Sequence, residues 1–72
     1  MLSLNIRKVS ALHRLTLREI DVARLYGHGQ SYKEIGVKLD ISPATVRNFV
    51  SRIYTKLAIN NKAALIKMLD AE

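Results

Sequence analysis

The sequence predicts a small all-α domain, and three observations support this prediction. Apolar residues recur at intervals of three and four through most of the chain, which is the spacing of one helix face. Short polar residues typical of helix N-caps stand immediately before these apolar segments. Only one Pro and three Gly interrupt the 72 residues, of which 49% are hydrophobic, as expected for one globular domain. We expect a four-helix bundle-like domain with helices at about residues 16–27, 31–39, 43–57 and 61–70.

The first two helices each begin with the spacing of a capping box. In this motif a hydroxyl accepts a hydrogen bond from the backbone N–H three residues on, while the carboxylate of that residue reaches back. Thr16 with Glu19, and Ser31 with Glu34, both fit it. We therefore expect the charges of Arg18 and Glu19 to serve a cap and ion pairs within or between helices, not catalysis.

Glycine marks the ends and contacts of these helices. Gly27 and Gly29 follow the apolar residues of the first helix and tolerate the left-handed backbone at which helices often end. In the second helix Ile35 and Leu39 form the predicted buried side. Gly36 lies beside them and allows a neighbouring segment to approach closely.

The third helix has a strong start signal, Ser42 as N-cap followed by Pro43 at the first helical position. Intervals of four, three and four then align the apolar residues Val46, Val50, Ile53 and Leu57. This alignment predicts one core-facing stripe along the helix.

The two ends of the chain are assigned by the same signals. Asn60 or Asn61 caps the fourth helix. Leu2, Leu4 and Ile6 alternate with polar residues like a short strand, but a lone strand has no partner here. We expect residues 1–14 to be an N-terminal arm or linker and residues 15–72 to be the domain.

The charge balance indicates an anionic partner. Twelve Lys and Arg against six Asp and Glu leave a net charge of +6, which favours nucleic acid or an acidic membrane surface. The absence of cysteine excludes a disulfide framework and a thiolate zinc site. No apolar run approaches the roughly 20 residues that cross a bilayer, and the N-terminal residues lack the apolar centre of a signal peptide, so we expect a cytoplasmic protein.

The helix at 43–57 has a second, polar face. Residues placed at about 100° steps put Ala44, Asn48, Ser51 and Thr55 opposite the core stripe, with Arg47 and Arg52 on the two flanks. Residues 41–57 contain no acid to pair with these arginines or with Lys56. Such a narrow polar face fits the major groove, where Arg and Asn donate to base edges.

The connection between the second and third helices supports the same interpretation. Only residues 40–42 separate them, which is the short turn of a helix-turn-helix. A solvated basic face is the ordinary alternative, but the turn and the charge together favour a reader of double-stranded DNA.

From Leu15 to about Leu69 the chain resembles the LuxR-type, or GerE-type, helix-turn-helix domain of bacterial transcription regulators. The matching segments are LTLRE at 15–19, SYKEI at 31–35, LDISPATVR at 39–47, IYTKL at 53–57 and NNKAAL at 60–65. Their order and separations fit without gaps. The resemblance implies a third helix in the major groove and a fourth helix that commonly mediates dimerisation.

The resemblance also implies roles for individual residues. Base readout falls on Arg47, Asn48 and Ser51, and DNA-backbone contacts fall on Lys33, Ser42, Thr45 and Lys56. The chain departs from the family pattern at three positions, since the family usually has Ala at Gly36, His at Phe49 and Gly at Ala58. We expect Phe49 to pack, and Ala58 to be strained if the helix exit is left-handed.

Further residues complete the predicted interface. Arg52 and Thr55 flank the polar face, and the Tyr32 hydroxyl either reaches a phosphate or is ordinary surface. Ala63 and Ile66 fall away from the buried side of the fourth helix and predict a homodimer that would set two third helices on successive turns of the groove.

Other function classes find less support. No grouping of Ser, His and Asp, no glycine-rich nucleotide loop and no His pairing appears, so we expect no enzyme, cofactor, metal or small-molecule ligand. A sigma-factor region 4, which also reads promoters and resembles EIG at 34–36, is one alternative, and RNA polymerase is a further candidate partner. A protein or membrane interaction module using the basic amphipathic helix is the other, although that helix's apolar side is needed for the core.

Overall fold

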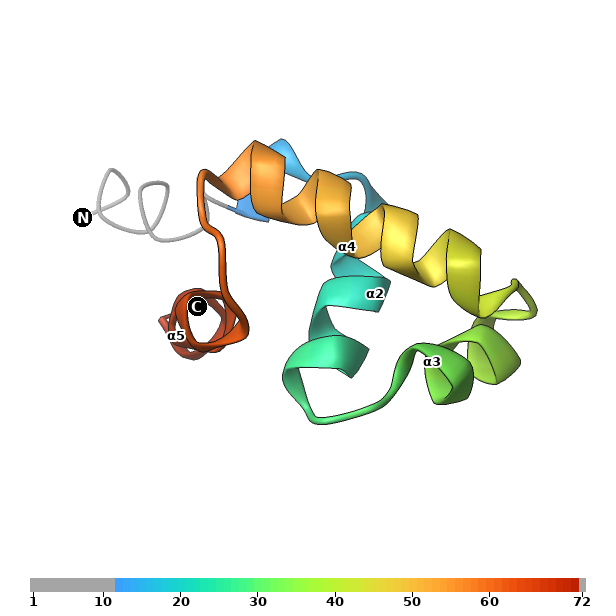
Figure 1. Cartoon of the computed structure of the whole chain (residues 1–72). Helices are drawn as coiled ribbons and strands as arrows, with labels where there is room; N and C mark the ends of the chain where they lie inside the picture. The colour runs from blue at the N-terminus through green and yellow to red at the C-terminus, as the bar shows by residue number, and fades with distance from the viewer. Residues whose placement is uncertain (1–11, 72) are drawn as a thin grey trace.

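The computed structural model describes residues 12–71, and helices are the only regular secondary structure in that range. The 3-10 turn η1 (Leu12–Arg14) is followed by α2 (Leu17–Gly27), α3 (Tyr32–Leu39), α4 (Pro43–Leu57) and α5 (Lys62–Asp70) (Figure 1). The predicted all-α fold class and the four predicted helices are confirmed. No helix in the described range is long and apolar enough to cross a membrane.

Each α-helix begins at a polar residue that the sequence predicted as its N-cap. At the first three helices the side-chain oxygen accepts a hydrogen bond of 3.1 Å from the backbone N–H three residues on, and these caps are Thr16, Ser31 and Ser42. At α5 the cap is Asn61, whose side chain accepts at 2.8 Å, and not Asn60. Each cap contributes about 1 kcal/mol, so local chemistry defines where the helices start.

α4 is the central helix of the domain. It packs against both α3 and α2, and α2 packs in turn against α5. Its four stripe residues, predicted from their spacing, are all buried. The other elements contribute the remaining buried apolar residues, which are Leu12, Leu15, Val22, Ala23, Ile35 and Leu65. Because this stripe supplies the core, only the opposite side of α4 remains available for a partner.

The turn between α3 and α4 is tight because of Gly36. A Cβ atom at this position would lie 2.5 Å from the backbone oxygen of Ile41, a separation that real side chains do not tolerate. The Ile41 N–H donates to the Gly36 carbonyl at 2.9 Å, and Asp40 between them adopts a left-handed φ of 59°. The predicted close approach at Gly36 is confirmed.

The left-handed helix exits follow the sequence in part. Gly29 has a φ of 95°, whereas Gly27 is the last helical residue of α2 and His28 forms its C-cap. Ala58 ends α4 with a φ of 57°. For a residue that carries a Cβ atom this conformation costs about 1 kcal/mol, so the strain expected at Ala58 is present.

The packed part of the chain begins before residue 15. Leu12 is only 6% exposed, and η1 contacts α4. Residues 12–14, assigned to the arm from the sequence, therefore pack on the domain through one buried leucine. The strand-like pattern at Leu2, Leu4 and Ile6 lies outside the described residues.

Candidate nucleic-acid interface

The side of α4 opposite the core is open to solvent. Arg47, Asn48 and Ser51 are exposed, while Val46 and Val50, which alternate with them in the sequence, are buried. This separation follows from the helical turn of about 100° per residue. We call the surface formed by Arg47, Asn48 and Ser51 the reading face. Because these three side chains are exposed, they are accessible to a base; buried side chains could not make such a contact.

α3 and α4 form the helix-turn-helix unit that holds the reading face. In Figure 1, α3 lies beneath the end of α4 at which that helix begins. The buried Ile35 and the half-buried Leu39 of α3 pack with the core. The tight turn at 40–42 fixes the start of α4 against α3, so the reading face has a rigid support.

The two arginines of α4 are not neutralised by acids. No carboxylate within residues 12–71 forms an ion pair with Arg47 or Arg52. The Arg52 guanidinium instead lies over the ring of Phe49, with 5.2 Å between its central carbon and the ring centroid. Phe49 is half-buried and packs against the core, as expected. The reading face therefore contains one uncompensated positive charge, that of Arg47, and a second, that of Arg52, lies at its border.

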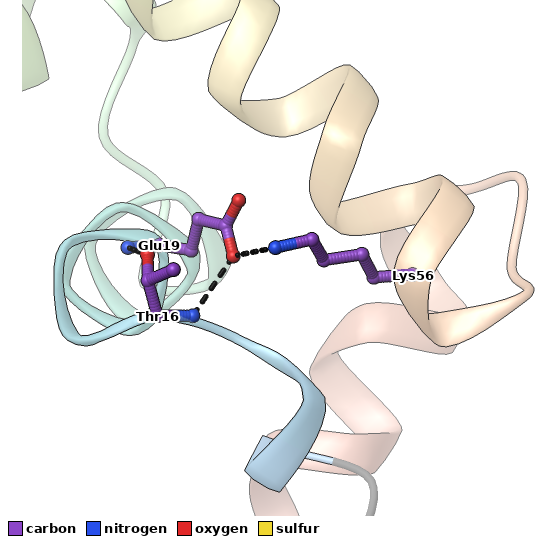
Figure 2. Close-up of polar contacts among 3 residues, drawn as sticks. All are labelled: Thr16, Glu19 and Lys56. Atoms are coloured by element: carbon purple, nitrogen blue, oxygen red, sulfur yellow. Dashed lines mark hydrogen bonds and ion pairs between the residues drawn. The ribbon is translucent and has the colours of Figure 1, made fainter.

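Lys56 differs from these arginines, and the sequence expectation that it is unpaired is wrong. Its Nζ donates to Oε1 of Glu19 at 2.8 Å (Figure 2). Residues 41–57 contain no acid, but the fold brings one from α2. The Lys56 side chain keeps 38% of its surface exposed, so this lysine stabilises the fold, and a contact to DNA stays a prediction.

Glu19 connects two helices through one carboxylate. Its side chain is 3% exposed, and Oε1 also accepts the Thr16 N–H at 2.9 Å. Burial alone would raise the pKa of Glu19. The hydrogen bonds from Lys56 and Thr16, together with the Lys56 charge, outweigh burial and lower the pKa below its ordinary value of 4.5. The expected cap and interhelical ion pair are both confirmed at this residue, and Arg18 pairs within its helix with Asp21 at 3.9 Å.

Tyr32 lies against another aromatic ring. It is half-buried and stacks on Tyr26 with 5.6 Å between ring centroids, and the Lys62 Nζ lies 4.4 Å from the Tyr26 centroid. Burial and a hydrogen bond with Tyr26 raise the pKa of Tyr32. Part of Tyr32 therefore serves packing between α2 and α3. The positive charge of Arg47 also acts on the Tyr32 hydroxyl, so Tyr32 lies near the reading face.

The predicted backbone-contacting residues of the helix-turn-helix cluster around its turn. Lys33 and Ser42 are exposed and line one shallow hollow of about 560 Å³. The hydroxyls of Ser42 and Thr45 lie 2.9 Å apart. Farther along α4, the exposed Thr55 donates its hydroxyl to the Ser51 carbonyl at 3.1 Å. Lys33, Ser42 and Thr45 thus come together at the start of α4.

α5 presents apolar surface on its outer side. Leu65 is buried, while Ala63 is exposed and Ile66 is 37% exposed. Ala63 is thus open to solvent, while Ile66 is so only in part, because its side chain also lies near Gly27 of α2. This surface is small, because only one of the two exposed residues is a large hydrophobic one.

The fold and the open α4 face define the class of the protein: a helix-turn-helix domain whose second helix presents an uncovered, positively charged reading face. A family model described as "Bacterial regulatory proteins, luxR family" (GerE) matches residues 13–69. The chain belongs to this family, as the sequence resemblance indicated, and the family consists of DNA-binding regulators of transcription.

Curated relatives agree with this assignment. The chain is 46% identical over 57 residues to the transcriptional regulatory protein LnrK and 40% identical over 57 residues to DesR, both of Bacillus subtilis. Each match covers 79% of this chain but only 26% of LnrK and 29% of DesR. DegU of Brevibacillus brevis is 42% identical over 55 residues, covering 76% of this chain and 23% of DegU. The chain thus spans about a quarter of the length of these relatives, and no solved structure matches it significantly.

Two contacting partners at the site were missed by reasoning from the sequence, although an ion pair at Glu19 was expected. The Lys56–Glu19 pair joins residues 37 positions apart, and Lys62 reaches Tyr26 from a different helix. No local spacing indicates either contact. One signal for the first pair was that Glu19 shares a helix face with Val22 and Ala23, three and four residues on, since a carboxylate carried into a core needs a partner.

Proposed function

We propose that this chain binds double-stranded DNA with sequence specificity and that α4 enters the major groove. The observation that carries this proposal is the reading face itself: Arg47, Asn48 and Ser51 are exposed on a helix whose other side is buried. A major groove admits an α-helix, and its base edges offer acceptors to Arg and both acceptors and donors to Asn.

Base readout and backbone contact fall to different residues in this proposal. Arg47, Asn48 and Ser51 read base edges. The residues around them fix the position of the domain through phosphates, because such contacts supply affinity without sequence information. The backbone-contacting set comprises Tyr32, Lys33, Ser42, Thr45, Arg52, Thr55 and Lys56. Within it, Lys56 is the weakest candidate because Glu19 already holds its ammonium group.

Dimerisation through α5 is the second part of the proposal. Ala63 and Ile66 would meet their copies across a two-fold axis, which places two α4 helices on successive turns of the groove. One domain of 8.1 kDa would bind only weakly by itself. Binding to the bacterial chromosome would place the protein in the cytoplasm, with RNA polymerase as a further candidate partner.

The alternative functions lose support on specific grounds. A membrane module needs a free apolar helix side, but the apolar stripe of α4 is buried. A sigma-factor region 4 is less consistent with the chain than the luxR family, whose model covers residues 13–69. Binding of the chain to core RNA polymerase, tested directly, would revive the sigma alternative.

Selection of bound duplexes from a random pool, performed at two salt concentrations, tests the proposal. We expect enrichment of one sequence at both concentrations, with the affinity falling steeply as salt rises. An enriched palindrome with half-site centres about ten base pairs apart would support the dimer. Binding that is equal for all sequences would contradict base readout, and absence of binding at low salt would contradict the proposal as a whole.

A further inference from the structure

Phe49 and Arg52 form a contact that the helix-turn-helix architecture does not require. The Phe49 ring is half-buried and packs against the core, so its position is fixed by the fold. Arg52 follows three residues later, one turn along α4, and is exposed. Its guanidinium carbon lies 5.2 Å from the ring centroid, within the range of about 6 Å for a cation–π interaction.

The position of Arg52 on α4 determines which neighbours its guanidinium can contact. Arg52 stands between Asn48, four residues earlier, and Phe49, three residues earlier, and a side chain reaches neighbours at both spacings. Leaning toward Asn48 would bring the guanidinium over the reading face. The guanidinium lies over Phe49 instead, so the ring draws it away from Asn48 and toward the border of that face.

The chemistry of the pair suits a phosphate. An aromatic ring holds the flat side of a guanidinium and leaves its N–H edge free, and that edge matches two oxygens of a phosphate. No carboxylate within residues 12–71 pairs with Arg52, so the edge is not already neutralised. The border of a groove-binding helix is where the sugar-phosphate backbone passes.

We propose that Phe49 is a positioning residue. It holds the Arg52 guanidinium at the border of the reading face, where the guanidinium can form a bidentate contact with a backbone phosphate. The proposal rests on the DNA-binding function proposed above. It assigns Arg52 to affinity and not to base choice, and it gives Phe49 an effect on DNA binding although its ring packs in the protein.

A double-mutant cycle tests this inference. The variants are Phe49→Leu, Arg52→Ala and both together, each measured for affinity to the selected duplex and to a random duplex over a range of salt. We expect Phe49→Leu to weaken binding by about two- to fivefold on both duplexes, which is the size of an exposed cation–π contact. In the Arg52→Ala background the same change should have no further effect. Arg52→Ala should also reduce the logarithmic salt slope by roughly 0.9, the value for one phosphate contact.

Two controls keep the outcome interpretable. Phe49→Tyr retains the ring and should bind like the wild type, while circular dichroism and urea unfolding establish that each variant is folded at the assay temperature. An equal loss from Phe49→Leu in both backgrounds, or a loss confined to the selected duplex, would overturn the positioning role. Failure of the wild-type chain to bind any duplex would instead overturn the proposed function.

Discussion

The two capping boxes of this domain have the same local chemistry and different roles. At α2, Thr16 N–H donates to Glu19 at 2.9 Å and Glu19 N–H donates to Thr16 at 3.1 Å. At α3 the corresponding distances between Ser31 and Glu34 are 2.8 and 3.1 Å. Within each box, the two hydrogen bonds satisfy backbone donors that the first turn of a helix leaves free.

The two capping boxes differ in the surroundings of their carboxylates. Glu19 is buried and receives the Lys56 ammonium group from α4, whereas Glu34 is exposed. The first carboxylate therefore joins two helices, and the second acts only within its own helix. The comparison teaches that a capping box identifies a helix start, while the neighbours of its carboxylate decide whether it also holds the tertiary structure.

The largest expected effect comes from removing the carboxylate of the first box. Glu19→Ala removes the acceptor of the Thr16 N–H and the ion pair with Lys56 together, while the N-cap bond from its own backbone N–H to Thr16 remains. We expect a loss of about 2–3 kcal/mol in the free energy of unfolding. The exposed part of Lys56 keeps this below the cost of a fully buried pair. Urea unfolding at pH 7 measures the loss, with Glu34→Ala as the matched control. Equal losses in the two variants would remove the distinction between the boxes.

A change on the reading face should have the opposite pattern. Arg47→Ala should weaken binding to the selected duplex by about 1–3 kcal/mol and relax preference at one base pair. Its free energy of unfolding should stay close to that of the wild type, because Arg47 is exposed and has no carboxylate partner in residues 12–71. Duplex titrations with single-base variants of the site measure the effect. A loss that is the same on random DNA would reassign Arg47 to the backbone.

Lys56→Ala tests the Glu19–Lys56 ion pair by removing its cation on α4. We expect it to lower the free energy of unfolding by about 1–2 kcal/mol, because Glu19 keeps its bonds within the box but loses its cation. Arg47→Ala, on the same helix and without a carboxylate partner in residues 12–71, is the control and should leave stability nearly unchanged. If Lys56→Ala instead flattened the salt slope of DNA binding with no loss of stability, the phosphate role predicted from the sequence would prevail.

Low pH should weaken the same ion pair between Glu19 and Lys56. The folded-state pKa of Glu19 lies below its ordinary value of 4.5, so its contribution is present above that pH. The contribution is lost as the pH falls from 4.5 through the folded-state pKa. Glu19→Gln cannot titrate and should show a flatter decline of unfolding free energy below pH 4.5. An unchanged decline would indicate that other carboxylates dominate, and Glu34→Gln measures what the exposed box contributes.

The smallest expected effect is a gain. Ala58→Gly removes the left-handed strain at the end of α4, two residues after Lys56, and should raise the free energy of unfolding by about 0.5–1 kcal/mol. DNA affinity should not change, because the reading face is untouched. Thermal unfolding followed by circular dichroism measures the gain, and a lower midpoint would show that the flexibility of glycine in the unfolded chain outweighs the strain.

Much of this domain was predictable from its sequence because its signals are local. The four N-caps, the apolar stripe of α4 and the close approach at Gly36 depend on residues a few positions apart. The exposure of Arg47, Asn48 and Ser51 followed as well, because the opposite side of the same helix had to be the core. The burial of Leu12 was not predicted, since a single leucine before a cap carries no periodic signal.

What the sequence determined by itself is where each helix starts and which of its sides is apolar, because caps and helical spacing act within one or two turns. What only the tertiary structure decided is which polar groups meet across helices. Glu19 and Lys56 lie 37 residues apart in the sequence. Only the packing of α2 against α4 brings the ammonium group of Lys56 within hydrogen-bond distance of the Glu19 carboxylate. As a result, Lys56 of α4 stabilises the fold through its ion pair with Glu19. Arg47 and Arg52 of the same helix have no acidic partners among residues 12–71.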